Sequence, residues 1–333
     1  MDSSAAAVIL LEQGYAVEGV YLLLRPDSGE TDGSASDARR VAEKLSVPFH
    51  TLDLRAEFYE TVIRPFAGAY ARGLTPNPCV LCNPKIKFGA MIEFASVRGA
   101  DCVATGHYAL TERCPETGKY LLKKSPSKKD QSYFLCGLNQ EQLSKIIFPV
   151  GKMEKESVRA AAERAGLSVA LKSDSQEICF IDGGGYAGYI ERSFSLVSPP
   201  GDFVDMSGQV IGRHKGVIHY TVGQRKGLGA FNRPMFVRGI DPESNAVKLC
   251  GEEDRYEAAL RASNMNWLSG EAPAAEFYAE VKTRSAASPA RAKVNVLENS
   301  VHIEFEKPQI LFSPGQAAVI YDGEILLGGG TIV

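Results

Sequence analysis

Apolar residues in the first half of the chain follow two patterns, a helical spacing and short continuous runs. The helical spacing predicts helices over residues 5–11, 37–45, 57–72, 86–98 and 153–165. The short runs predict strands over residues 17–24, 48–52 and 101–105. Because helices and buried strands alternate, we expect an α/β domain with a parallel sheet and right-handed crossovers.

The pattern changes after Ser193, where the helical spacing largely disappears. Residues 199–201, Pro-Pro-Gly, mark a linker, and residues 212–229 combine basic side chains with many glycines. Such a stretch is typical of a loop-rich module that binds a polyanion, and equally of a small β domain whose glycines form turns. Short alternating segments then predict an antiparallel barrel or sandwich, with strands over residues 276–282, 293–297, 301–305, 317–321 and 325–327. We expect three domains, over residues 1–185, 186–255 and 256–333.

Composition and charge are those of a soluble globular protein. The chain has 333 residues, of which 44% are hydrophobic and 23% are charged, and this length predicts two or three domains. The net charge of −3 gives no sign of a nucleic-acid partner, so any basic surface must be local. The sequence shows no signal peptide and no apolar run of the ~18 residues that a membrane span needs. Seven irregularly spaced cysteines argue against a secreted disulfide framework, so we expect a cytoplasmic protein.

Candidate chemistry concentrates in residues 75–83, Thr-Pro-Asn-Pro-Cys-Val-Leu-Cys-Asn. The two prolines restrict the backbone and predict a stiff loop ahead of the helix over residues 86–98. A thiol between such a loop and a helix N-terminus lies in positive potential, which lowers its pKa and favours the thiolate. This pattern suits reactive sulfur, a redox pair or half of a zinc site. A structural zinc site needs four ligands, and no second Cys-x-x-Cys or histidine pair completes one.

A second candidate cysteine, Cys179, lies in the apolar run 178–181. A lone cysteine in such a run is ordinarily an inert buried side chain. Here the polar run 173–177 precedes it and a glycine-rich run follows, which predicts a position at a strand end and at the mouth of a turn. Active sites of open α/β sheets lie at such positions. Two thiols that are far apart in sequence can exchange sulfur if the fold brings them together.

His107 and the basic run 123–129 are further candidates. His107 follows Gly106 at the predicted end of a strand, where a histidine either serves a site or bonds to local backbone. Four lysines in the basic run precede Asp130 and Gln131, and such a run is either a solvated surface or a phosphate contact. The residues alone leave both alternatives open.

Six motifs, in this order, resemble those of the tRNA-specific 2-thiouridylases over essentially the whole chain. They are residues 75–83, Ala-Thr-Gly-His-Tyr at 104–108, Lys-Asp-Gln-Ser-Tyr-Phe at 129–134, Ser-Gln-Glu-Ile-Cys-Phe at 175–180, Tyr-Thr-Val-Gly-Gln-Arg-Lys-Gly-Leu-Gly at 220–229 and Ser-Pro-Gly-Gln at 313–316. The resemblance implies a PP-loop ATP pyrophosphatase domain of the adenine nucleotide alpha hydrolase type, a small central domain and a C-terminal β-barrel. It also implies that ATP adenylates the C2 oxygen of the wobble uridine in certain tRNAs, and that sulfur then replaces this oxygen.

The resemblance also implies roles for particular residues. Cys179 would carry the persulfide that delivers sulfur, and Cys82 would be the second catalytic thiol, which forms a disulfide with Cys179 as sulfur is released. Cys82 is chosen over Cys79 because some family members carry an acidic residue at the Cys79 position. The target base would lie against Asn77, Pro78 and Cys79.

Further positions match the family's contacts to tRNA and to the nucleotide. The residues that would contact tRNA are His107, Lys129, Asp130, Gln131, Arg284 and Gln316. The residues that would lie against ATP are Asp2, Ser3, Leu22 and Gly106. ATP chemistry implies Mg²⁺, for which the sequence shows no ligand. The persulfide implies a sulfur donor such as a cysteine desulfurase or a sulfur-relay protein.

The implied chemistry agrees with these residue types. A uracil C2 oxygen is a poor leaving group, so adenylation lets AMP depart instead, and a persulfide on a low-pKa cysteine supplies nucleophilic sulfur. An anticodon base is single-stranded and can be splayed into a pocket.

One family motif is incomplete in this chain. The family's phosphate loop reads Ser-Gly-Gly-Val-Asp-Ser after a first strand, and here only Asp2 and Ser3 follow Met1. The absent N–H groups would bind the ATP phosphates and the absent strand would lie in mid-sheet, so we expect the chain as written to bind ATP poorly and to fold badly. A GUG valine codon read as the initiator would produce this start. In-frame upstream codons for a strand and Ser-Gly-Gly would support that hypothesis.

Two other functions fit parts of the sequence. A different PP-loop enzyme, one that adenylates an acid or an amide, would need neither Cys82 nor Cys179, so a double serine variant would keep its activity. A non-enzymatic, truncated tRNA-binding protein would bind tRNA without ATP–pyrophosphate exchange.

Overall fold

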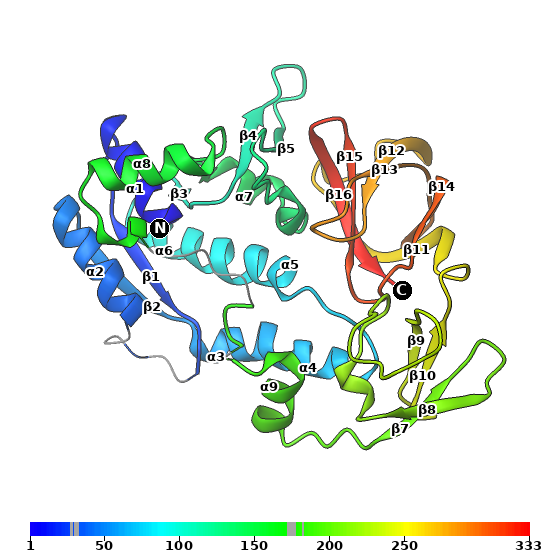
Figure 1. The fold of residues 1–333 in the computed structure, drawn as a ribbon. Coiled ribbons are helices and arrows are strands. Elements are labelled where there is room, and N and C mark those ends of the chain that lie inside the picture. The colour runs from blue at the N-terminus through cyan, green and yellow to red at the C-terminus, as the bar shows by residue number, and fades with distance from the viewer. Residues whose placement is uncertain (27–28, 30–32, 172–177, 182) are drawn as a thin grey trace.

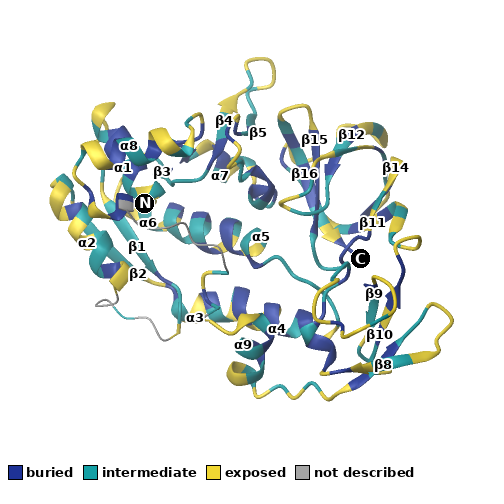
Figure 2. Cartoon of the chain, viewed as in Figure 1, coloured by how far each residue is buried: buried dark blue, intermediate teal, exposed yellow. Residues whose placement is uncertain are grey.

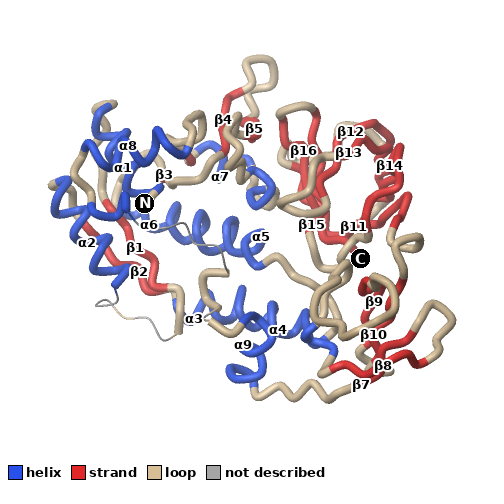
Figure 3. Tube along the Cα trace, viewed as in Figure 1, coloured by secondary structure: helices blue, strands red, loops and turns tan. Residues whose placement is uncertain are grey.

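The computed structural model describes residues 1–26, 29, 33–171, 178–181 and 183–333. Figure 1 shows a helical N-terminal domain, a small β domain and a C-terminal β-barrel. Figure 3 shows that helices prevail in the N-terminal half of the chain and strands in the C-terminal half. The two halves meet near the change of pattern after Ser193.

The sheet of the N-terminal domain consists of two parallel strand pairs. β1 (Gly19–Leu23) pairs with β2 (Phe49–Asp53), and β3 (Val103–Ala104) pairs with β6 (Ile146–Ile147). The predicted parallel arrangement is confirmed, and β1, β2 and β3 are the three predicted strands. β6 was not predicted, because two residues are too few to show a period.

Helices flank these strands (Figure 1). They are α1 (Asp2–Glu12), α2 (Gly33–Leu45), α3 (Arg55–Phe58), α4 (Arg64–Ala71), α5 (Pro78–Cys82), α6 (Met91–Val97), α7 (Gln140–Ser144), α8 (Lys155–Arg164) and α9 (Gly185–Phe194). The 3₁₀ turns are η3 (Ser132–Leu135), η4 (Ser168–Leu171) and η5 (Val217–His219). All five predicted helices are present.

Two π-helical segments, η1 (Tyr59–Ile63) and η2 (Asn83–Ala90), continue α3 into α4 and α5 into α6. Each lies beside a proline, Pro65 or Pro84, which has no N–H to donate to the helix ladder. The helix predicted from residue 86 therefore begins earlier, at Pro78, and includes both cysteines of the motif.

An unpredicted hairpin joins the N-terminal domain to the barrel. β4 (Ala109–Arg113) pairs with β5 (Tyr120–Lys124), and β5 pairs with β16 (Ile325–Ile332) of the barrel. Apolar and polar residues do not alternate in β4 or β5, which read Ala-Leu-Thr-Glu-Arg and Tyr-Leu-Leu-Lys-Lys, so no strand was predicted here. The hairpin extends the barrel sheet by two strands.

The central residues form the small β domain that was one of the two alternatives. Its strands are β7 (Gly201–Val204), β8 (Val210–His214), β9 (Phe236–Asp241) and β10 (Ala246–Cys250), in the order β8-β7-β10-β9. β7 and β10 are parallel, and the other neighbours are antiparallel.

The C-terminal strands close into the predicted barrel. With β16 they are β11 (Tyr256–Trp267), β12 (Glu276–Lys282), β13 (Ala290–Val296), β14 (Ser300–Ile310) and β15 (Ala317–Asp322), in the order β11-β14-β13-β12-β15-β16. Pairing of β11 with β16 completes the ring. β11 was not predicted, because its register shifts between Ser263 and Asn266, and this shift breaks the alternation.

One hydrophobic core joins the N-terminal and central domains and reaches the cysteine motif. It includes Phe58, Phe66, Cys82, Phe180 and, from the central domain, Phe203. Figure 2 shows α4 and α5 largely in the buried and intermediate colours, in the middle of the molecule. The candidate thiol Cys82 therefore belongs to the core and not to a surface loop.

Candidate active site

The cysteine motif begins as a capped helix. Asn77 is the N-cap of α5, and its side chain accepts the Cys79 N–H at 3.2 Å, a contact of the kind that stabilises a helix start by about 1 kcal/mol. Pro78 follows at the first helical turn and is buried. Cys79 is half-buried, whereas Cys82 at the end of α5 is only 5% exposed. The three-residue spacing brings the two thiols to neighbouring positions on one side of the helix.

Cys179 approaches this helix from a distant part of the chain. It is exposed in a turn in which the Ile181 N–H donates to the Ile178 carbonyl at 2.9 Å. Its neighbour Phe180 is buried and meets the rings of Phe58 and Phe66 edge-on, with centroid distances of 5.7 and 5.2 Å. This aromatic anchor places Cys179 beside the core cluster that contains Cys82. Residues 178–181 form this turn and no strand, so the predicted strand end at Cys179 is wrong for these residues. Residues 172–177 lie outside the described residues.

The three candidate thiols share one electrostatic environment. Burial is the largest influence on the pKa of Cys79 and Cys82, and the charge of Cys179 raises the pKa of both as well. Lys87 on η2 opposes this effect and lowers the pKa of all three. All seven cysteines of the chain are free thiols in this structure.

The predicted low thiol pKa is wrong for the structure as it stands. Burial is the largest influence and raises the pKa of Cys82 to about 12. The pKa values of Cys79 and Cys179 are raised by the same cause, although exposure of Cys179 to solvent limits the rise there. Cys82 lies one turn inside the continuous helix that begins at Pro78, and the helix potential at this position does not offset the loss of hydration.

The effect of the Lys87 charge can be tested directly on the pKa of Cys179, the most exposed of the three thiols. In Lys87→Gln the pKa of Cys179 should rise, because its largest pKa-lowering neighbour is gone and Arg25 alone remains among the cations that act on it. We expect alkylation of Cys179 at pH 8 to slow about fivefold, which corresponds to roughly 1 kcal/mol of charge interaction in a water-like medium. The pH dependence of iodoacetamide labelling, followed by peptide mass spectrometry, measures this change.

Two variants control that experiment. Lys85→Gln removes an exposed lysine of the same helical segment that is not among the charges acting on the thiols, and it should leave the labelling curve unchanged. Lys87→Arg should restore the curve. If Lys87→Gln and Lys85→Gln give the same labelling curve, the Lys87 charge does not lower the pKa of Cys179.

His107 lies close to the thiol cluster and is uncharged. Its Nδ1 lies 2.7 Å from the Thr105 hydroxyl, and its ring packs between Phe88 and Phe148. Burial, and then the Lys87 charge, lowers the pKa of His107 to about 3. Near neutral pH this residue therefore offers a hydrogen bond, not a charge.

The residues of the 129–134 motif divide by exposure. Lys129 is exposed. The Asp130 carboxylate accepts the Ser125 N–H at 2.9 Å and the Ser132 hydroxyl at 2.9 Å, so it shapes the loop around it. The Gln131 side chain accepts the Tyr108 N–H at 3.0 Å and thereby ties this motif to the one at 104–108. Two motifs that are separate in sequence form one structural unit here.

Much of the basic run is paired with acids. Lys123 pairs with Glu112, and Lys124 pairs with Glu280 of the barrel at 3.2 Å. Lys128 and Lys129 are exposed. The solvent-facing part of this run is therefore the 128–129 end.

Arg284 and Gln316 make hydrogen bonds to backbone within the chain. One guanidinium nitrogen of Arg284 donates to the carbonyls of Val222 and Leu311 at 3.1 and 3.0 Å. The Gln316 amide donates to the Thr75 carbonyl at 2.8 Å. Both residues therefore connect the barrel to another domain, a use that the sequence alone did not indicate.

Three of the four residues expected at the nucleotide, Asp2, Ser3 and Gly106, come together at the start of α1. A Cβ added to Gly106 would lie 2.5 Å from the backbone of Asp2 and of Ser3, so these segments touch. Lys155 pairs with Asp2 at 2.8 Å, and no side chain caps α1. Uncapped N–H groups beside a lysine fit a phosphate group, whereas the Asp2 carboxylate would have to move away from a phosphate bound there. Leu22 lies half-buried in β1.

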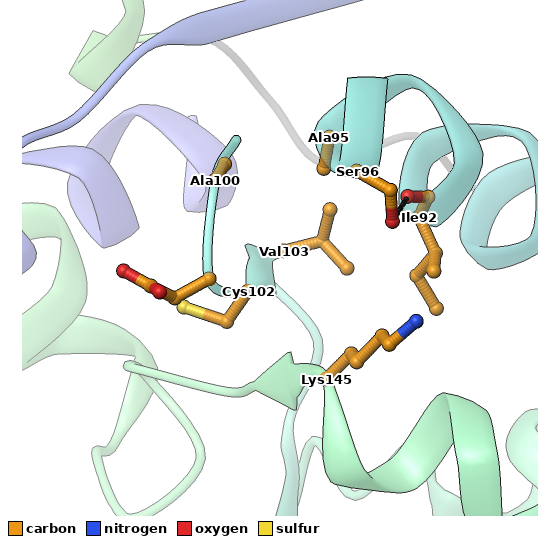
Figure 4. Close-up of a pocket in the computed structure, with 8 residues that line it drawn as sticks. Ile92, Ala95, Ser96, Ala100, Cys102, Val103 and Lys145 are labelled. Carbon is orange, nitrogen blue, oxygen red and sulfur yellow. Dashed lines mark hydrogen bonds between the residues drawn. The ribbon is translucent and has the colours of Figure 1, made fainter. Parts of the chain in front are cut away.

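Metal sites and cavities add little to this picture. Among the described residues, no group of three or more His, Cys, Asp or Glu side chains could hold a metal ion. Figure 4 shows a cavity of about 10 Å³ between α6 and the start of β3, lined by Cys102 and Lys145 among others, with room for about one water. A hollow of about 360 Å³ is formed by central-domain residues between Arg225 and Met235. Neither is lined by Cys79, Cys82 or Cys179.

Two positively charged residues of the site, Lys87 and Lys155, were not predicted from the sequence. Lys87 stands one residue before a buried phenylalanine in the predicted helix, and Lys155 stands in the charged helix α8. Nothing in either local pattern marks a site, because both are ordinary helix residues. In the part of the chain that the structure describes, no helix is long and apolar enough to cross a membrane.

Comparisons with known proteins cover the whole chain. Family models match residues 1–183 (tRNA methyl transferase HUP domain), 192–251 (tRNA methyl transferase PRC-barrel domain) and 257–332 (aminomethyltransferase beta-barrel domain). The chain is 44% identical over 345 residues to the tRNA-specific 2-thiouridylase MnmA of Acetivibrio thermocellus, an alignment that covers 100% of this chain and 96% of the relative. It is 43% identical over 343 residues to the protein of the same name from Clostridioides difficile, with 100% and 95% covered. The chain therefore belongs to the tRNA-specific 2-thiouridylase family.

Proposed function

We propose that this protein is a tRNA-uridine 2-sulfurtransferase that thiolates the wobble uridine at position 34 in an ATP-dependent reaction. The observation that carries the proposal is that Phe180, the neighbour of Cys179, packs in the same core cluster as Cys82, because sulfur transfer needs two thiols in reach of each other. The proposed domains span residues 1–185 for catalysis, 186–255 for tRNA contact and 256–333 for the barrel.

The proposed sulfur transfer uses both thiols. A sulfur donor, such as a cysteine desulfurase or a sulfur-relay protein, loads Cys179 with a persulfide. The terminal sulfur of the persulfide bonds to C2 of the adenylated uridine, and the C2–O bond breaks as AMP leaves. The Cys82 thiolate attacks the Cys179 Sγ and breaks the persulfide S–S bond. The transferred sulfur is reduced, and the two cysteines are oxidised to a disulfide that an external dithiol must reduce before the next cycle.

Burial gives Cys82 a specific requirement in this scheme. A thiol with a pKa of about 12 is almost entirely protonated near neutral pH, so Cys82 reacts only when its proton is removed as sulfur moves. Lys87 stabilises the thiolate that forms. Before tRNA binds, a protonated Cys82 also does not attack the Cys179 persulfide, so the persulfide is not cleaved early.

The start of α1 would hold the nucleotide. ATP supplies the adenylyl group that turns the uracil C2 oxygen into a leaving group. Backbone N–H groups of Asp2 and Ser3 would bind phosphate, and Gly106 allows their close approach because it has no side chain. Leu22 would pack against the nucleotide from β1. The accompanying Mg²⁺ would be held chiefly by phosphate oxygens and water.

The base and the tRNA would lie over the capped start of α5. Asn77, Pro78 and Cys79 would line the uridine, with His107 as a neutral hydrogen-bonding group beside them. Among the remaining contacts proposed for tRNA, Lys129 supplies charge at the surface. Asp130 and Gln131 hold the loop that presents Lys129, and Arg284 and Gln316 act from the barrel.

The experiment that tests this function is a thiolation assay of the full chain. The protein is incubated with unmodified tRNA, ATP, and a cysteine desulfurase with cysteine, and 2-thiouridine is measured by mass spectrometry of the digested tRNA. We expect thiouridine that depends on ATP and is lost in the double variant Cys82→Ser/Cys179→Ser. ATP-dependent activity on another substrate that survives in this variant would favour a different adenylating enzyme. tRNA binding without pyrophosphate release would favour a binding protein.

A further inference from the structure

The barrel touches the cysteine motif through both backbone polar groups of one residue. The Thr75 N–H donates to the Pro314 carbonyl at 2.7 Å, and the Thr75 carbonyl accepts the Gln316 amide at 2.8 Å. In Figure 1 the segment between α4 and α5 runs out to the barrel beside the C-terminus. Thr75 lies two residues before Asn77, the N-cap of the helix that carries Cys79 and Cys82.

The contact is close enough to require a glycine. Gly315 has φ +92°, and a Cβ added to it would lie 3.0 Å from the Thr75 nitrogen. That distance is shorter than an ordinary van der Waals contact. The Thr75 nitrogen is a backbone atom, so it cannot move away by a change of rotamer as a side chain could. The turn 313–316 is therefore shaped to receive the backbone at Thr75.

The turn is fixed on its other side. The Gly315 N–H donates to the Ile332 carbonyl at 2.9 Å, and the Ile332 N–H donates to the Gln316 carbonyl at 2.9 Å, so the end of β16 holds it. The Ser313 hydroxyl donates to the Val222 carbonyl of the central domain at 3.1 Å. All three domains thus meet at this turn.

A second contact from the N-terminal domain supports the same segment. The buried Tyr133 hydroxyl donates to the Ala317 carbonyl, one residue after the turn, at 2.9 Å. Burial raises the pKa of Tyr133, and the Asn77 side chain is among the groups that oppose this rise. Asn77 is in turn bonded to the Cys79 N–H. A continuous chain of contacts therefore leads from the barrel to the first turn of α5.

We propose that the barrel turn 313–316 is a positioning element for the catalytic thiols, in which Gln316 and Gly315 hold Thr75 and so fix α5 against the core. Gln316 then acts on α5 through its hydrogen bond to Thr75, a role separate from the tRNA contact proposed above. The expected effect on thiolation depends on the proposed function, whereas the expected effect of the turn on the position of α5 does not. The barrel is, in this proposal, part of the catalytic apparatus.

The test is Gln316→Glu in the full chain, a change that keeps the size of the side chain but removes the amide donor to Thr75. We expect kcat for thiolation at saturating tRNA to fall about tenfold, the effect of one lost hydrogen bond. Release of α5 should also let iodoacetamide reach the buried Cys82 about five- to tenfold faster. Peptide mass spectrometry of labelling at fixed pH provides this second measurement.

A pair of glycine variants isolates the contact from backbone strain. Gly315→Ala and Gly323→Ala both place alanine at a positive φ, but only Gly315 has Thr75 within reach, since nothing lies within 4 Å of a Cβ at Gly323. Faster Cys82 labelling is expected in Gly315→Ala alone. Thermal unfolding of each variant shows whether it is folded before labelling is compared.

Outcomes separate the inference from the proposed function. Unchanged Cys82 labelling in Gln316→Glu would overturn the positioning role, and a raised Kd for tRNA beside it would leave Gln316 as a tRNA contact alone. If the wild-type chain makes no thiouridine, the proposed function fails. Labelling of Cys82 still decides the positioning role in that case, because the reaction needs neither tRNA nor ATP.

Discussion

Replacing Cys179 with serine is expected to lower the rate of uridine thiolation by at least about a thousandfold, because a hydroxyl oxygen cannot carry a persulfide. Pyrophosphate release from ATP in the presence of tRNA should continue, since adenylation precedes sulfur transfer and uses other residues. The measurement is a single-turnover assay of thiouridine beside an assay of pyrophosphate.

Cys114→Ser is the matched control for this prediction. Cys114 follows β4 in the hairpin, with its thiol 3.0 Å from the Glu116 carboxylate, and the same atom change there should leave thiolation unchanged. A Cys179→Ser variant that thiolates tRNA at the wild-type rate would remove Cys179 from the mechanism. Loss of both thiolation and pyrophosphate release would indicate a structural defect, and circular dichroism would then reveal it.

Gly106→Ala is expected to lower kcat/KM for ATP about a hundredfold. The new Cβ would lie 2.5 Å from backbone atoms of Asp2 and Ser3, so the first turn of α1 must move, and a shift of about 1 Å costs this much when reacting groups are misplaced. The same overpacking should lower the free energy of unfolding by about 1–3 kcal/mol. ATP titration of tRNA-dependent pyrophosphate release and chemical denaturation measure the two effects.

Gly239→Ala provides the comparison for that variant. A Cβ added to Gly239 in β9 meets no atom within 4 Å, so the same substitution there should change neither ATP use nor stability by much. If Gly106→Ala is folded and uses ATP like the wild type, the nucleotide does not lie at the start of α1, and the assignment of Asp2 and Ser3 fails with it.

The position of Lys87 illustrates why site chemistry was only partly predictable. The sequence indicated two cysteine segments and a family of sulfur-transfer enzymes, but it also predicted a low thiol pKa from one local feature, a helix start. Burial of Cys82 against Phe58 and Phe66 reverses that expectation. Desolvation depends on every segment that covers a group, and these segments are distant in sequence.

The sequence by itself determined the order and type of most elements. Helical spacing over residues 57–72 and 153–165 and alternation over 276–282 report which face of each element is buried, and that information is local. β6 is too short to show a periodic pattern in the sequence. In β11 the register shift interrupts the alternation of apolar and polar residues.

Only the tertiary structure decided how these pieces act on one another. It brought Cys179 beside Cys82, placed Lys87 among the thiols and set the barrel residue Gln316 against Thr75. No local pattern encodes such contacts, because each depends on the packing of whole domains. The reason is physical: periodicity follows from the geometry of one segment, whereas charge interaction, desolvation and close backbone approach arise between segments.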